Sequence, residues 1–168
     1  MLKIFYMLQP FMEDNYRRIS VREYARMMNL SPPSASTMLK DLQQEGLLLM
    51  EKERQHHFFT ANRTNAIFTG LQRLYYQQKL GPLLKYMSSQ FITPTIILFG
   101  SLVKGEVTKN SDIDIALFSP TKKQVDLALY EKKLKRPIQL LRFKNREEVK
   151  NRELLHNILN GTMMAGGW

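Results

Sequence analysis

The chain has 168 residues, enough for one domain or two small ones, and its 43% hydrophobic content is enough for a packed core. The formal net charge of +10 is spread over both halves and indicates a polyanionic partner, an anionic substrate, or simply a basic surface. The absence of cysteine excludes disulfides and thiolate metal sites. No apolar run is long enough for a membrane span, so we expect a cytoplasmic protein with no signal peptide and no membrane partner.

The first quarter of the chain shows helical patterns. Apolar residues at helical spacing predict a helix over residues 2–13, which Pro10 kinks or shortens. Ser20 and Glu23 fit a capping box, in which each side chain satisfies a backbone N–H of the first turn. This predicts a second helix that begins at Ser20 and ends at Asn29, a residue that tolerates the left-handed conformation.

A third helix and two short strands follow. Ser31 is a suitable N-cap, Pro32 suits the first helical position, and Gly46 ends the helix. Residues 47–51 and 57–61 have strand patterns, and the polar residues between them predict a turn.

Two helices joined by a short turn and followed by a hairpin resemble the winged helix-turn-helix domains of prokaryotic transcription regulators. The resemblance implies a DNA-binding domain over residues 1–80, with the third helix in the major groove of double-stranded DNA. Hydroxyls and cations on this helix and on the hairpin suit phosphates and base edges. The residues expected to contact DNA are Ser34, Ser36, Thr37, Lys40, Arg54 and His56. The alternative is a winged helix that serves protein contacts or homodimerisation.

Two helices separated by a break are predicted next. Apolar residues at helical spacing cover residues 65–80 and resume at residues 83–93, and Gly81–Pro82 lies between them. We interpret the first as a linker helix, which serves either dimerisation or core packing. A domain boundary is expected at Gly81.

A strand, a turn and a second strand carry the clearest chemical signal. The apolar run of residues 96–99 ends at Gly100–Ser101, and Asp112 and Asp114 open a second apolar run about ten residues later. Residues i and i+2 share a face of a strand, so both carboxylates project the same way. Adjacent carboxylates repel, and their usual reason for lying together is a shared divalent cation, for which oxygen ligands favour Mg²⁺. The alternative is a pair of solvated aspartates at a strand start.

The rest of the chain alternates helix and strand. The patterns predict a helix over residues 124–134, a strand over 138–143, a helix over 146–159 and a short strand over 162–166. The basic cluster of residues 132–136 is either a solvated helix end or a contact for phosphates.

The order Gly-Ser, spacer, Ser-Asp-x-Asp resembles the signature of the DNA polymerase β-like nucleotidyltransferases, and of their minimal branch in particular. The resemblance implies a nucleotidyltransferase fold over residues 81–168, with a small mixed sheet flanked by helices. With the winged helix, this makes an α/β (α+β) protein. It also implies that Asp112 and Asp114 bind Mg²⁺ and form the catalytic pair. A nucleoside triphosphate, with ATP expected, would be held by four further residues: Gly100, Ser101, Lys104 and Ser111.

One part of the family pattern is missing. Nucleotidyltransferases of this superfamily use a third carboxylate on a later strand, and the matching strand here has Gln139 at that place. An amide cannot act as a base near neutral pH. Asp126 and Glu131 are candidate substitutes on the preceding helix.

Two functions therefore stay open. One is a DNA-binding regulator whose second domain binds Mg²⁺ and nucleotide with weak or lost catalysis. The other is an active transferase that moves a nucleoside monophosphate to a protein or nucleic-acid hydroxyl. The minimal branch also resembles the antitoxin halves of toxin–antitoxin pairs, which adds a small helical protein as a candidate partner.

Overall fold

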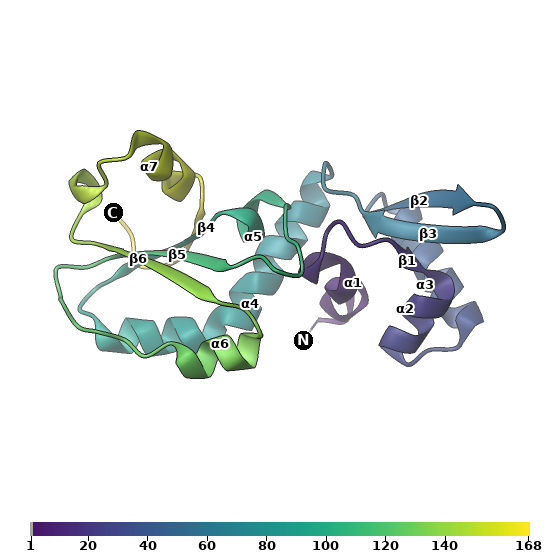
Figure 1. Ribbon diagram of the computed structural model, residues 1–168, viewed down its shortest axis with the longest axis horizontal. Coiled ribbons are helices and arrows are strands. Elements are labelled where there is room, and N and C mark those ends of the chain that lie inside the picture. The colour runs from purple at the N-terminus through teal and green to yellow at the C-terminus, as the bar shows by residue number, and fades with distance from the viewer. Residues whose placement is uncertain (1) are drawn as a thin grey trace. The chain divides into compact units, whose positions relative to one another are not determined.

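The computed structural model describes residues 2–168, and the chain divides into two compact units (Figure 1). The first unit comprises the chain up to Gln72 together with the short segment Gly105–Lys109. The second comprises Arg73–Lys104 and Asn110–Trp168. The chain thus returns briefly to the first unit between two stretches of the second.

The first unit combines three helices with a small antiparallel sheet. Its elements are α1 (Lys3–Glu13), β1 (Ile19–Ser20), α2 (Val21–Met28), α3 (Pro32–Gln44), β2 (Leu48–Glu53) and β3 (His56–Ala61). The strand order is β1-β3-β2, and both pairings are antiparallel. β2 and β3 form the predicted hairpin, in which each strand is one or two residues longer at the turn than expected.

The predicted helix ends of this unit are confirmed. One half of the predicted capping box forms, because the Ser20 hydroxyl accepts a hydrogen bond from the Glu23 N–H, whereas the Glu23 carboxylate pairs with Arg17 at 2.6 Å. Asn29 ends α2 in the left-handed conformation, with φ of 53°. The Ser31 hydroxyl accepts from the Ser34 N–H at the start of α3. These local bonds fix the short turn between α2 and α3.

The second unit is built on a mixed four-stranded sheet, as the α/β class predicts. Its elements are the C-terminal part of α4 (Ala66–Gln90), β4 (Thr95–Phe99), α5 (Ser101–Lys104), β5 (Ile113–Phe118), α6 (Ala128–Leu134), β6 (Ile138–Phe143), the 3₁₀ turn η1 (Arg146–Glu148), α7 (Arg152–Leu159) and β7 (Thr162–Ala165). The strand order is β6-β5-β4-β7. β5 and β6 are parallel, and the other two pairings are antiparallel.

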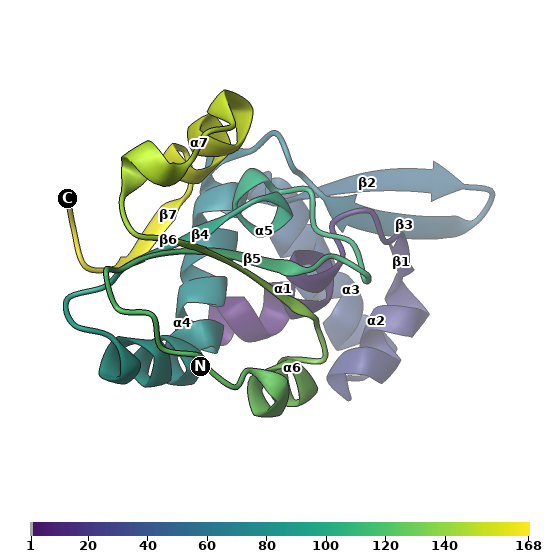
Figure 2. The same ribbon diagram turned by 60° about the vertical axis from the view of Figure 1, so that its left-hand side comes forward.

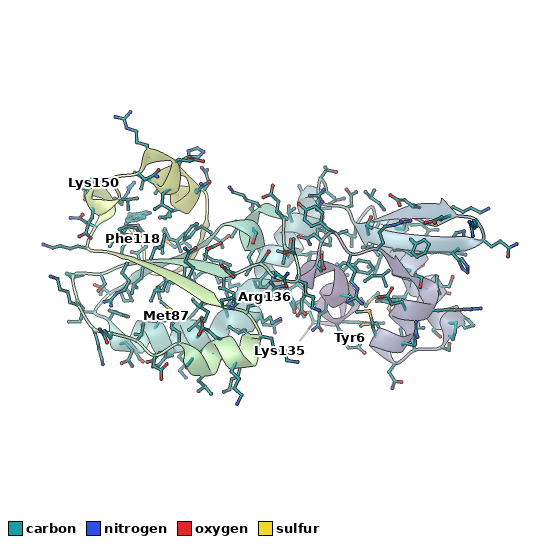
Figure 3. The ribbon with its side chains drawn as sticks, viewed as in Figure 1. Tyr6, Met87, Phe118, Lys135, Arg136 and Lys150 are labelled. Atoms are coloured by element: carbon teal, nitrogen blue, oxygen red, sulfur yellow. The ribbon has the colours of Figure 1, made fainter. Side chains whose placement is uncertain are left out.

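Helices cover both faces of this sheet. α4 and α6 lie on one face and α7 lies on the other, in both views of the ribbon (Figures 1 and 2). Phe118 points to the α7 side and Met87 lies on the α4 side (Figure 3). On the α7 side, Phe118 packs with Ala116, Val149 and Ile158 in one buried cluster. Burial on both faces explains why β4 and β5 are almost continuously apolar.

The predicted break at Gly81–Pro82 is wrong, because α4 runs through both residues without interruption. A proline inside a helix removes one hydrogen bond and crowds the preceding turn. Leu83 and Met87 follow it and are almost fully buried, so their packing against the sheet offsets that cost. Although α4 has 25 residues, no helix among residues 2–168 is both long and apolar enough to cross a bilayer.

Two other helix predictions need correction. α6 begins at Ala128 rather than at residue 124, since the Asp126 carboxylate accepts a hydrogen bond from the Ala128 N–H and forms a turn there. The helix expected over residues 146–159 is split into η1 and α7. Val149 is buried at the break, and Asn151 then caps α7 by accepting from the Leu154 N–H.

A substitution at Pro82 tests the continuity of α4. Pro82 is exposed, so Pro82→Ala changes the helix backbone with little loss of packing. We expect a gain in the free energy of unfolding of about 1–3 kcal/mol, measured by urea denaturation. Ser88→Ala, at another exposed position of α4, is the control and should change stability by only a few tenths of a kcal/mol. A loss of stability in Pro82→Ala would contradict a continuous helix.

Candidate functional site

Asp112 and Asp114 lie where β5 begins, in the middle of the second unit's sheet. Ile113, Ile115 and Leu117 are buried, as predicted for the alternate positions of this strand. The alternation directs Asp114 to the α7 side of the sheet. Asp112 is exposed, and Asp114 is partly buried.

The turn after β4 is shaped to receive the Asp114 carboxylate. Phe99 pairs with Asp114 across the antiparallel ladder, which brings Gly100 beside this side chain. Gly100 has φ of 75°, and a Cβ at this position would collide with the Asp114 Oδ2 atom. The positive φ and the close approach of the carboxylate both require glycine at this position. Gly100 therefore allows the Asp114 side chain to lie beside the turn.

The two carboxylates carry an electrostatic cost. Burial raises the pKa of Asp114, and the nearby Asp112 charge raises it further. A cation near the pair would offset both effects, so the two carboxylates could contribute ligands to a divalent metal. Mg²⁺ commonly takes one or two protein carboxylates and completes its shell with water and phosphate oxygens.

The other predicted nucleotide-binding residues lie around the same turn. Ser101 opens α5, and the Val103 and Lys104 N–H groups bond the Gly100 carbonyl to close the turn. The Lys104 ammonium donates to Asn157 Oδ1 on α7 at 3.0 Å. The Ser111 carbonyl accepts from the Arg136 guanidinium at 2.6 Å.

Arg136 is a residue whose role sequence reasoning missed. Arg136 belongs to the basic cluster of residues 132–136 in the sequence, yet only 7% of its surface is exposed. The guanidinium donates to the carbonyl of Ser111, the residue directly before Asp112. Lys135 before it takes the left-handed conformation that ends α6. A helix-ending lysine followed by a strand is a weak signal, and only the packing distinguishes Arg136 from its solvated neighbours.

Gln139 occupies the position beside Asp114 on the next strand. The two residues pair in the parallel register of β5 and β6, so their side chains share the α7 face of the sheet. Among residues 2–168, no group of three or more acidic, histidine or cysteine side chains could hold a metal. The candidate substitutes have local roles: Asp126 accepts from the Ala128 N–H at 3.0 Å, and Glu131 accepts from the Ile138 N–H at 2.8 Å.

The first unit contains the residues predicted to contact DNA. Ser34, Thr37 and Lys40 are exposed on α3, Ser36 is partly buried, and Arg54 and His56 are exposed at the hairpin turn. The hydroxyls of Ser34 and Thr37 already bond within α3 or its cap.

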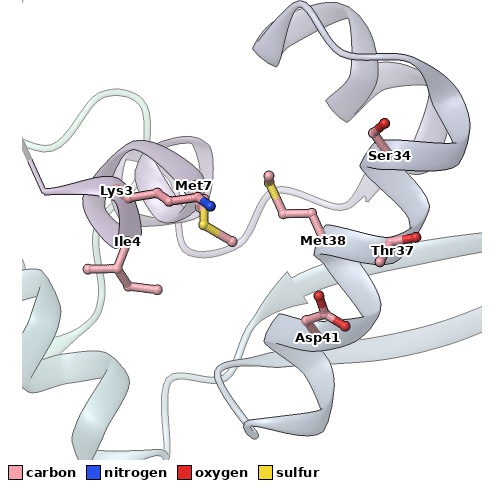
Figure 4. Close-up of a pocket in the computed structure, with 7 residues that line it drawn as sticks. All are labelled: Lys3, Ile4, Met7, Ser34, Thr37, Met38 and Asp41. Carbon is pink, nitrogen blue, oxygen red and sulfur yellow. The ribbon is translucent and has the colours of Figure 1, made fainter.

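Ser34 and Thr37 also line a groove of about 620 Å³ between α1 and α3 (Figure 4). Its α1 side is formed by Lys3, Ile4 and Met7. The groove includes Asp41, whose charge disfavours a phosphate at that edge.

A second groove of about 600 Å³ in this unit is more basic. Arg22 and Arg26 of α2 line it together with His56 and His57 of the hairpin. Of the described residues that line it, none is acidic. Arg18 pairs with Glu51 and Glu53 on β2, at 3.3 and 2.9 Å. Sequence reasoning missed Arg22 and Arg26, although their spacing of four residues on the polar face of a helix is a usable signal.

A comparison with protein families assigns the segment that carries the aspartate pair. Residues 82–160 match the nucleotidyltransferase domain family. No curated protein and no solved structure matches the chain significantly. The matched segment contains Gly100, Asp112, Asp114 and Gln139, and it leaves out α1, α2, α3 and the β2–β3 hairpin.

The raised pKa of Asp114 predicts a stabilising substitution. When the pKa of a carboxyl group is higher in the folded than in the unfolded chain, folding favours its protonated form. The stability that this preference contributes is fully present below the unfolded pKa of about 3.9, and it is lost as the pH rises through the folded pKa. Asp114→Asn removes this loss. We expect its midpoint of thermal unfolding at about pH 7, without added metal, to exceed the wild-type value by about 1–3 °C, with a smaller difference near pH 4.

The control for this prediction is Asp41→Asn, at an exposed position of α3. It should show no comparable gain. A lower midpoint for Asp114→Asn at neutral pH would contradict the electrostatic account of the pair.

Proposed function

We propose that the second unit binds a Mg²⁺–nucleoside triphosphate and that the whole chain is a DNA-binding, transcription-regulator-like protein whose nucleotidyl transfer is weak or lost. The observation that carries the nucleotide site is the packing of the Asp114 carboxylate against Gly100, within a segment that matches the nucleotidyltransferase domain family. ATP is the first nucleotide to test.

Each residue of the proposed nucleotide site has a physical role. Asp112 and Asp114 hold the metal, and the missing side chain at Gly100 leaves room for the Asp114 carboxylate beside the turn. The backbone N–H groups of the Gly100–Ser101 turn would bind the terminal phosphates. When bound, Mg²⁺ would neutralise phosphate charge and stabilise the attacking and leaving oxygens. Lys104 adds a positive charge, and Ser111 aligns Asp112 through its bond to Arg136. Relief of the carboxylate repulsion favours this occupancy.

The proposal of weak catalysis depends on Gln139. It occupies the place beside Asp114 where a third carboxylate would bind metal and activate the acceptor hydroxyl. An uncharged amide coordinates a metal weakly and does not take up a proton near neutral pH. The bonds already made by Asp126 and Glu131 argue against either as a replacement.

The alternative is an active transferase that moves a nucleoside monophosphate to a protein or nucleic-acid hydroxyl. The family match favours it, since the turn and the aspartate pair are retained together. In that case a small helical protein is a candidate acceptor and partner, as for the antitoxin of a toxin–antitoxin pair.

DNA binding is proposed for the first unit as a winged helix-turn-helix. The short capped turn between α2 and α3, followed by the β2–β3 hairpin, supports it. Lys40 on α3 and Arg54 at the hairpin turn are exposed cations. The basic groove with Arg22 and Arg26 adds to the positive surface available to phosphates. Binding as a homodimer would match a two-fold symmetric DNA site.

A substitution that restores the missing carboxylate tests the catalytic proposal. The protein is incubated with each labelled nucleoside triphosphate and Mg²⁺, with and without cell extract, and label transfer and pyrophosphate release are scored. We expect Gln139→Asp to raise the rate of label transfer above wild type by about ten- to a hundredfold. Gln139→Leu should abolish any remaining transfer. Wild-type transfer that Gln139→Asp does not increase would favour the active-transferase alternative.

A salt titration tests the DNA proposal. Lys40→Ala and Arg54→Ala should each weaken binding to double-stranded DNA and reduce the slope of log K against log salt by about 0.9 per phosphate contact. Arg17→Ala is the matched control, because that guanidinium is already paired with Glu23. Unchanged affinity and slope in both variants would show that α3 and the hairpin do not face DNA.

A further inference from the structure

The carboxylate of Glu131, a partly buried residue of α6, holds the first residue of β6. Its Oε1 atom accepts a hydrogen bond from the Ile138 N–H at 2.8 Å. β6 is an outer strand of the sheet and pairs only with β5. At this N–H, the side chain of a helix residue therefore takes the place of a further strand.

The backbone of Glu131 holds the residues that lead from α6 to β6. Its carbonyl accepts from the Lys135 N–H, which belongs to the residue in the left-handed conformation at the end of α6. The same carbonyl accepts from the Arg136 N–H at 3.3 Å. We call residues 135–138 the α6–β6 joint. Glu131 bonds this joint near its beginning through a backbone atom and at its end through a side-chain atom.

The α6–β6 joint in turn bonds the peptide groups on both sides of Asp112. The Arg136 guanidinium, which is buried, donates to the Ser111 carbonyl at 2.6 Å. The Pro137 carbonyl accepts from the Ile113 N–H at 2.9 Å. Two consecutive residues of the joint therefore bond the residues directly before and after Asp112. All of them lie in the same part of the second unit, Asn110–Trp168.

We infer that Glu131 is a positioning residue of the Mg²⁺–nucleotide site: it fixes the α6–β6 joint, and the joint fixes the backbone that carries the Asp112 carboxylate. The inference rests on the proposed nucleotide site and gives Glu131 a role other than that of a third carboxylate. Glu131 touches neither metal nor nucleotide. It limits the conformations of the backbone around Asp112, so that the aspartate pair is arranged before the ligand arrives.

Two substitutions of Glu131 separate its hydrogen bond from its charge. Glu131→Gln and Glu131→Ala both remove the negative charge, but only Glu131→Gln keeps a side-chain oxygen that can accept from the Ile138 N–H. Loss of the charge alone would strengthen the binding of an anionic nucleotide, and it would do so in both variants. Loss of a metal ligand or a base would weaken function in both variants. A difference between the two variants therefore reports the hydrogen bond.

The matched control is Asp126→Ala. The Asp126 carboxylate accepts from the Ala128 N–H at 3.0 Å at the opposite end of α6, so this variant loses the same charge and the same kind of bond away from the joint. Three quantities are measured on each full-length variant: the dissociation constant for Mg²⁺–ATP, the midpoint of thermal unfolding, and hydrogen exchange of the Ile113 amide, which bonds the joint.

We expect Glu131→Ala to weaken Mg²⁺–ATP binding by about tenfold and to speed exchange at the Ile113 amide. Glu131→Gln should stay within about twofold of the wild-type affinity. Asp126→Ala should leave affinity and exchange near wild type even where it lowers the midpoint. Glu131→Asp keeps the charge but is one methylene too short to reach the Ile138 N–H, and it should weaken binding by about threefold or more.

Equal Mg²⁺–ATP affinity in Glu131→Ala and Asp126→Ala would overturn the inference while leaving the nucleotide site intact. An equal loss of affinity in Glu131→Gln and Glu131→Ala would also overturn it, in favour of Glu131 as a metal ligand. If Glu131→Ala does not fold, wild-type affinity in Glu131→Asp overturns it.

A wild-type protein that binds no Mg²⁺–nucleotide overturns the proposed function instead. In that event the Ile113 amide decides whether Glu131 fixes the backbone at the aspartate pair. Faster exchange in Glu131→Ala than in Asp126→Ala supports this role, and equal exchange contradicts it.

Discussion

The repulsion between Asp112 and Asp114 is the constraint on which the rest of the site depends. Both carboxylates lie at the start of a strand whose other residues are buried, and burial together with mutual charge raises the pKa of Asp114. Such a pair costs free energy, which neighbouring groups, solvent or a bound cation can offset. Gly100 leaves room for the Asp114 carboxylate, and Arg136 holds Ser111 before Asp112.

Local signals in the sequence predicted much of this arrangement. Ser20, Asn29 and Ser31 mark helix ends through bonds within a few residues, and such bonds form in the same way in most contexts. The strand that carries the aspartates was recognisable because a buried strand has a distinctive apolar run.

The wrong predictions concern features that depend on packing between residues far apart in the sequence. α4 continues through Gly81–Pro82 because residues that follow are buried against the sheet, and Val149 breaks a helix because it joins the core below α7. The bonds of Asn15 to Val107 connect residues far apart in the chain, and neither residue type suggests the pairing. The burial of Arg136 within a basic cluster likewise depends on packing that its neighbours in the sequence do not indicate.

The two units contribute different kinds of support for the proposed function. Residues 82–160 match the nucleotidyltransferase domain family and include the turn and the aspartate pair, while Gln139 pairs with Asp114 on the next strand. The first unit provides the basic groove that is lined by Arg22 and Arg26. In the proposed function, the second unit binds a nucleotide with little turnover and the first unit binds DNA.

The most direct test of the account is a calorimetric titration of the protein with ATP in the presence and absence of Mg²⁺. The account predicts saturable binding that requires Mg²⁺ in the wild-type protein and is lost when Asp112→Ala and Asp114→Ala are combined. The other three nucleoside triphosphates are titrated in the same way if ATP does not bind. Binding that persists in the double variant, or a wild-type protein that binds none of the four, would contradict the central claim that this aspartate pair forms a metal–nucleotide site.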